Sequence, residues 1–103
     1  MLLVNTDFLS GKQLQTLGLV SGSAVVARTV DKNIRSDFKK IFGNEVKGYS
    51  ELLDDARGLA TKHLEEDARR LGADAVINVR YSIGSLMDCT ITVLASGTAV
   101  RYQ

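Results

Sequence analysis

The chain has 103 residues, of which 45% are hydrophobic and 24% charged, and its 13 basic and 12 acidic side chains leave a formal net charge of +1. These values are typical of one globular domain and exclude the basic surface that phosphate backbones require, so we expect no nucleic-acid partner. No apolar run approaches the roughly 20 residues of a transmembrane helix, so we expect no membrane partner. The single cysteine excludes an internal disulfide framework. We expect a cytoplasmic protein.

The first third of the chain predicts extended structure. Residues 2–4 are apolar and compatible with a short edge strand, and turn-forming residues follow at 5–7 and 10–13. Residues 17–30 are rich in β-branched and small side chains, which favours the first long strand. Gly22 lies inside this strand and indicates either a bulge or the close approach of another backbone.

A short helix is predicted over residues 34–42. Four apolar residues fall at i, i+4, i+7 and i+8, on one helical face: Ile34, Phe38, Ile41 and Phe42. Residues 31–33 supply capping side chains before it, and Gly43 with Asn44 supplies its end.

A long helix over residues 51–71 is the clearest prediction in the chain. Its apolar residues recur at steps of three and four: Leu52, Leu53, Ala56, Leu59, Ala60, Leu64, Ala68 and Leu71. Ser50 is the expected N-cap, and Glu51, Asp54 and Asp55 are expected near the positive end of the helix dipole. Gly72 is the expected left-handed residue after the helix, preceded by Arg69 and Arg70.

Two strands are predicted after the long helix, over residues 75–83 and 89–100. Asp74 stands in the turn that leads into the first of them, and we interpret it as a turn residue rather than a catalytic acid. Strict alternation places Ile77, Val79, Tyr81 and Ile83 on one face of that strand. Asn78 and Arg80 then point to the opposite face, where Arg80 is a candidate anion-binding side chain at a subunit interface or central channel.

The last strand is apolar on both faces. Alternation places Cys89, Ile91, Val93 and Ala95 on one side and Leu94 and Val100 on the other. A strand of this kind needs cover on both sides, and assembly into an oligomer is one way to provide it.

Four segments in this order resemble the YbjQ-like family, whose members are labelled as heavy-metal-binding domains. The matching segments are GLVSGSAV at 18–25, FKKIFGNEVKGYSELLDDAR at 38–57, LEEDARRLGADAVINVRY at 64–81 and SGTAV at 96–100, while the hairpin at 82–90 is short. The resemblance implies a single α+β domain over residues 1–103, with β-α-α-β-β order, a small antiparallel sheet and two layers. It also implies a ring, a homopentamer in which extra short strands join neighbours. It supplies no established activity.

The metal-binding label finds little support in the residues themselves. Heavy metals and zinc are bound by clusters of Cys and His two to five positions apart, whereas this chain has one of each, His63 and Cys89. We therefore assign no metal ligands. An alternative remains in which the symmetry of a ring brings copies of Cys89 or His63 to a common axis.

Catalytic residues and cofactor sites are likewise not assigned. His63 is the one candidate base, and neither a G-x-S-x-G elbow nor a phosphate-binding loop is present. Glu65, Glu66 and Asp67 are consecutive and fan around the helix instead of converging on an ion. Gly22 and Gly97 are interpreted as bulges or sites of tight packing against the helix or a neighbouring chain, and the alternative is that they let a ligand approach the backbone. We expect a non-enzymatic binding or structural protein without a cofactor, and the alternative is an enzyme with a composite site between subunits.

Overall fold

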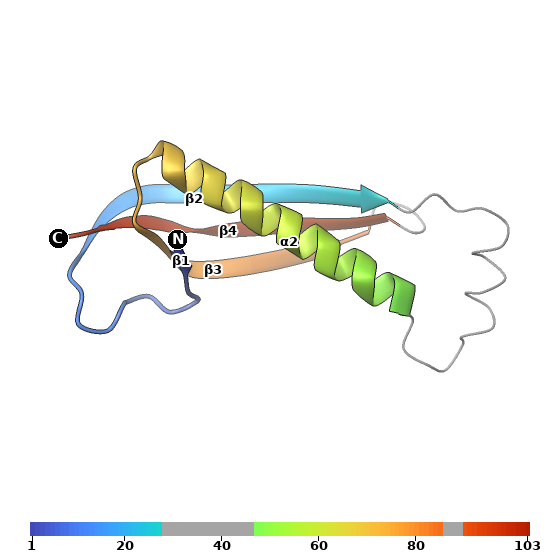
Figure 1. The fold of residues 1–103 in the computed structure, drawn as a ribbon, viewed down its shortest axis with the longest axis horizontal. Helices are drawn as coiled ribbons and strands as arrows, with labels where there is room; N and C mark the ends of the chain where they lie inside the picture. Colours follow the sequence, from blue (N-terminus) through green and yellow to red (C-terminus); the bar gives the residue numbers. More distant parts are fainter. Residues whose placement is uncertain (28–46, 86–89) are drawn as a thin grey trace, which may run out of the picture.

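The computed structural model describes residues 1–27, 47–85 and 90–103. These contain the strands β1 (Leu2–Leu3), β2 (Leu14–Ala27), β3 (Ala75–Gly84) and β4 (Thr90–Tyr102) and the helix α2 (Lys47–Arg70). Helix α2 crosses one face of the sheet diagonally, which gives two layers and confirms the α+β class (Figure 1). The short helix predicted over 34–42 lies outside the described residues, as do residues 28–30 of the first predicted strand. No helix in these described ranges is long and apolar enough to cross a membrane.

The four described strands form one sheet in the order β1-β3-β4-β2. Strand β4 is central and pairs antiparallel with β2 and with β3. Strand β1 pairs parallel with β3, Leu2 beside Ala75 and Leu3 beside Val76, so the sheet is mixed and the predicted antiparallel sheet is wrong at this edge. A two-residue apolar run does not predict whether its strand is parallel or antiparallel to the neighbouring strand. That direction depends on how the rest of the chain connects the two strands.

The helix begins earlier than its sequence pattern predicts. It starts at Lys47, so Ser50 lies inside the helix and is not its N-cap, and no acidic residue lies in its first turn. The proposed interaction of Glu51, Asp54 and Asp55 with the helix dipole is therefore wrong. The other end agrees with the prediction: Gly72 has a φ of 76°. The N–H groups of Gly72 and Ala73 donate to the carbonyl oxygens of Arg69 and Ala68, which closes the helix as a Schellman motif.

The main core lies between α2 and the sheet. Its buried residues are Val20, Ala24, Leu52, Ala56, Ala60, Leu64, Ala68, Val76, Val79, Ile91, Val93, Ala95 and Ala99. At Gly22 the helix comes so near that an added Cβ would collide with the backbone of Ala60, His63 and Leu64. The predicted close approach at Gly22 is thus confirmed, and the alanines on the apolar face of α2 allow it.

A β-bulge interrupts β3 at Asn78. The register with β4 shifts between Ile77 and Arg80, and Asn78 adopts a φ of 54°. As a result Val79 packs in the main core beneath the helix, whereas Ile77 packs in a separate cluster. The prediction that Ile77 shares a face with Val79, Tyr81 and Ile83 is wrong, because the extra residue reverses the alternation.

The described residues cover only part of the face of the sheet that lies away from α2. At one end Ala75, Ile77 and Val100 form a small second core with Val4, Leu9 and Leu14 from the N-terminal segment and the start of β2. The remainder, which we call the open face, carries three exposed apolar side chains: Leu19 is 81% exposed, Val25 58% and Leu94 44%. The predicted two-sided apolar character of β4 is therefore confirmed.

Candidate functional site

A polar groove lies between the second half of α2 and the middle of β2. It has a volume of about 310 Å³ and is lined by Ser21, Gly22, Ser23, His63, Glu66, Asp67 and Arg70. Because β2 is the edge strand on this side of the described sheet, the groove follows a row of backbone groups that no fifth strand pairs.

Two side chains of the helix bind this edge. The Asp67 carboxylate accepts the backbone N–H of Ser21 at 3.0 Å, and Nδ1 of His63 lies 2.7 Å from the carbonyl oxygen of Ser23. Residues four apart on a helix lie on one side, about 6 Å apart, and residues two apart on a strand are separated by a similar distance. The spacing of His63 and Asp67 on the helix therefore matches the spacing of Ser23 and Ser21 on the strand. We call these two hydrogen bonds the edge clamp.

The edge clamp defines what His63 can do chemically. A carbonyl oxygen only accepts, so Nδ1 is the donor in this hydrogen bond, and Nε2 takes no part in it. In the described part of the chain His63 bonds to backbone and to no hydroxyl or carboxylate side chain. The groove thus brings together an imidazole, two carboxylates and the Arg70 guanidinium, which lies 3.6 Å from Asp67, without a nucleophile activated by a base.

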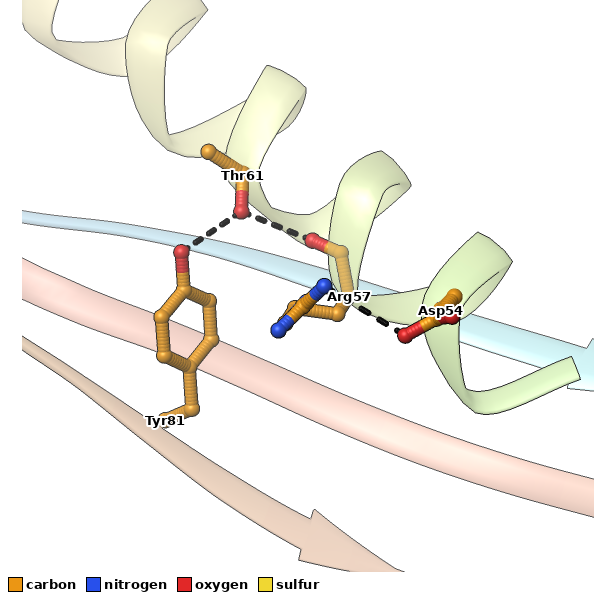
Figure 2. Close-up of polar contacts among 4 residues, drawn as sticks. All are labelled: Asp54, Arg57, Thr61 and Tyr81. Carbon is orange, nitrogen blue, oxygen red and sulfur yellow. Dashed lines mark hydrogen bonds and ion pairs between the residues drawn. The ribbon is translucent and has the colours of Figure 1, made fainter. Parts of the chain in front are cut away.

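A second tie joins the helix to β3. The Thr61 hydroxyl donates to the carbonyl oxygen of Arg57 at 2.7 Å, so its oxygen accepts the hydroxyl proton of Tyr81, also at 2.7 Å (Figure 2). On the helix surface Arg57 also reaches the carboxylate of Asp54 at 3.3 Å. Neither Thr61 nor Tyr81 is identified by the sequence pattern, since their meeting depends on the angle at which α2 crosses the sheet.

Beside Tyr81 lies a second hollow, where β1 ends. It measures about 500 Å³ and is lined by Leu3, Val4, Asn5, Thr6, Val79 and Tyr81. The chain after β1 still bonds to β3 here, because the Asn78 N–H donates to Thr6 and the Val79 N–H donates to Val4. Beyond Val79, β3 has no neighbour on this side in the described structure.

The residues that sequence analysis considered lie apart from one another. The Asp74 carboxylate accepts the backbone N–H of Tyr102 at 2.9 Å, so it fixes β4 across the turn instead of bonding within the turn. Arg80 is exposed and pairs with Ser96, which places it on the open face. Asn78 occupies the bulge and is half-buried.

The metal-ligating residue types in the described ranges do not form a heavy-metal site within one chain. No group of three His, Cys, Asp or Glu side chains gathers in residues 1–27, 47–85 and 90–103. Glu65 pairs with Arg69 at 3.4 Å, Asp67 binds the β2 edge, and His63 contacts Ser23 through Nδ1. Cys89 lies outside the described residues.

Comparison with known proteins places these features in a family of wide distribution. The family model described as "Putative heavy-metal-binding" matches residues 1–103. The chain is 46% identical over 101 residues to a UPF0145 protein of Clostridium novyi, covering 98% of both chains. It is 47% identical over 102 residues to one of Halorubrum lacusprofundi, again covering 98% of both.

The fold has a counterpart among solved structures. A crystal structure of a protein of unknown function from Pediococcus pentosaceus, assigned to the DUF74 family, superimposes with a TM-score of 0.67. The match covers 100% of this chain and 98% of the other at 13% identity, so it supports the fold alone.

Proposed function

The chain belongs to the YbjQ-like family, the UPF0145 proteins, and from this premise we propose that it acts as a non-enzymatic homo-oligomer, a ring of five copies. Its role in this proposal is to bind a partner between subunits or to build a structure, and not to catalyse a reaction. Three of the polar side chains that could serve catalysis are engaged with backbone: His63 through Nδ1 with Ser23, Asp67 with Ser21 and Asp74 with Tyr102.

The observation that carries the proposal is the open face. Val25 and Leu94 lie on adjacent strands and close together, since Val25 pairs with Thr92 and Leu94 with Ser23, and Leu19 extends the patch along β2. Exposed apolar surface costs about 25 cal/mol for each Å², which association with a second copy removes. Contiguous exposed apolar patches are typical of interaction surfaces.

Native mass spectrometry of the wild-type chain, purified without a chelator, tests the proposal. We expect a complex of five copies, and a shift toward smaller species for Leu94→Ser. The matched control is Leu71→Ser, because Leu71 is also 44% exposed but stands at the end of the helix. A monomeric wild-type chain would overturn the proposal, and a stable complex of another number would overturn the pentamer only.

The same spectra test the metal function that the family description carries. A ring that uses symmetry-repeated His63 or Cys89 would gain mass in steps of a metal ion, and His63→Ala or Cys89→Ser would remove those steps. Rings without such steps, or steps that both variants retain, would dispose of that alternative.

A further inference from the structure

The described sheet ends in two different edges, and each leaves a short stretch of backbone unpaired. One is the last part of β3, beyond the reach of β1, and the other is the end of β2, beyond the edge clamp. Unpaired edge groups are templates for the addition of another strand.

On β3 the unpaired groups belong to Tyr81 and Ile83. The Val79 N–H points outward, to Val4, and β3 pairs regularly with β4 from Arg80 onward. Alternation then points the N–H and C=O of Tyr81 and Ile83 outward as well. Their side chains lie on the same side as the helix, because the Tyr81 hydroxyl bonds to Thr61, and Ile83 is 62% exposed.

On β2 the unpaired groups belong to Val25 and Ala27. Ser21 and Ser23 point outward, where Asp67 and His63 bind them, and the register to β4 is regular from Gly18 to Ala27. Val25 and Ala27 therefore also point outward, past the edge clamp. Their side chains lie on the open face, since the intervening Gly22 and Ala24 face the helix.

The edge of β3 and the edge of β2 can pair in only one relative direction. Outward-pointing residues of neighbouring parallel strands have side chains on opposite faces, whereas in antiparallel strands they share a face. The outward residues of β3 face the helix and those of β2 face away, so only a parallel pairing keeps both helices on the same side. Strands β2 and β3 already run in one direction, since each is antiparallel to β4.

We propose that the edge of β3 at Tyr81–Gly84 pairs in parallel with the end of β2 of a second copy, with Ile83 beside the neighbour's Val26. In this register the Ile83 N–H donates to the neighbour's Val25 carbonyl. The N–H groups of the neighbour's Val25 and Ala27 donate to the carbonyls of Tyr81 and Ile83. The joint uses the free edge groups and leaves the edge clamp intact.

This inference rests on the proposed homo-oligomer and specifies how it closes. The joint is head-to-tail, so it generates a ring when the rotation between copies closes. Thr92 of β4 pairs with Val25 of β2 on one side and with Gly84 of β3 on the other, so the two unpaired stretches lie at the same end of the sheet. A ring whose symmetry axis runs along the strands requires this arrangement.

Two proline variants test the joint, because proline at an outward-pointing edge position removes the donor without breaking a bond to β4. We expect Ile83→Pro and Val25→Pro each to lose the ring in native mass spectrometry. An equimolar mixture should form a one-to-one heterodimer, since each variant retains the edge that the other lacks. Thr16→Pro is the control, because Thr16 pairs with Val100 beside the bulge near the start of β2, outside both the joint and the apolar side chains of the open face, and it should retain the ring.

The outcomes separate the joint from the oligomer. A wild-type ring that survives in Ile83→Pro or Val25→Pro, or a mixture that forms no heterodimer, overturns the joint and leaves the homo-oligomer standing. A monomeric wild-type chain overturns both. Ile83→Asp keeps the N–H and places a carboxylate against Val26, and it should also weaken association at least tenfold; an unchanged ring in that variant contradicts the register.

Discussion

On the face that α2 covers, the sheet and the helix meet through glycine and alanine, whereas the open face carries large apolar side chains that nothing in the described structure covers. The small residues of the covered face are Gly22, Ala56, Ala60, Ala68, Ala95 and Ala99. The large apolar residues of the open face are Leu19, Val25 and Leu94. Small residues allow backbones to approach closely, and close packing is what fixes one arrangement of helix on sheet. Large exposed residues instead offer area to a partner. The first face therefore serves folding, and the second is the surface that the proposed association would use.

The largest expected effect contrasts two leucines, one on each face. Leu64 is fully buried and Leu94 is 44% exposed. We expect Leu64→Ala to lower the free energy of unfolding by about 4 kcal/mol, because it leaves a cavity between α2 and β2. Leu94→Ala should cost less than about 1 kcal/mol in the dissociated chain. Urea unfolding at a protein concentration below the dissociation point measures both, and equal losses would contradict the division between the faces.

The close approach at Gly22 is tested by adding one methyl group. Gly22→Ala places a Cβ against backbone atoms of α2, which have no side-chain freedom to give way. We expect a loss of about 3 kcal/mol in the free energy of unfolding, measured by thermal or chemical denaturation. Gly58→Ala is the matched control, because nothing lies within 4 Å of its Cβ and it stands on the exposed side of the same helix. That variant should gain up to about 1 kcal/mol from helix propensity.

The covered face was largely predictable from sequence because its signals are local. The stripe of apolar residues from Leu52 to Ala68 has the helical period, and Gly72 occupies the position after a helix that favours a left-handed residue. The close approach at Gly22 also follows from its place inside a strand of β-branched residues. The helical period and the helix end are decided by residues within a few positions of one another, whereas at Gly22 the sequence indicates a bulge or a close approach but not the partner, which is the backbone of Ala60, His63 and Leu64.

The edges were not predictable in the same way. The bulge at Asn78 leaves no trace in the alternation of Ile77, Val79 and Tyr81, although asparagine is one of the residues that tolerates a positive φ. The edge clamp depends on the line along which α2 crosses β2, which places His63 and Asp67 over Ser23 and Ser21. The parallel pairing of β1 depends on the path of the chain from residue 4 to β3. These are long-range consequences of the fold.

A smaller effect is expected at Gly72, where the helix ends. Its φ of 76° suits glycine, and an added Cβ would meet the Arg101 guanidinium, a flexible group that can move. Gly72→Ala should therefore cost about 1 kcal/mol, the penalty of the left-handed conformation itself. Gly84→Ala, which has neither a positive φ nor a neighbour within 4 Å, should change the free energy of unfolding by less than about 0.5 kcal/mol. Differential scanning calorimetry compares the two.

The smallest effect concerns the hydrogen bond between the hydroxyl groups of Tyr81 and Thr61, which joins β3 to α2. Tyr81 and Tyr102 are similarly exposed, at 40% and 39%. The Tyr81 hydroxyl bonds to Thr61, whereas the Tyr102 contact is made by its ring, whose centroid lies 5.0 Å from the Lys12 ammonium. Tyr81→Phe should cost about 0.5 to 1 kcal/mol, since water replaces part of the lost hydrogen bond. Tyr102→Phe keeps its ring and should cost almost nothing. Because Tyr81 also belongs to the proposed joint through its backbone alone, Tyr81→Phe should leave the ring intact in native mass spectrometry. A variant that dissociated would show that the side chain, and not the strand edge, holds the copies together.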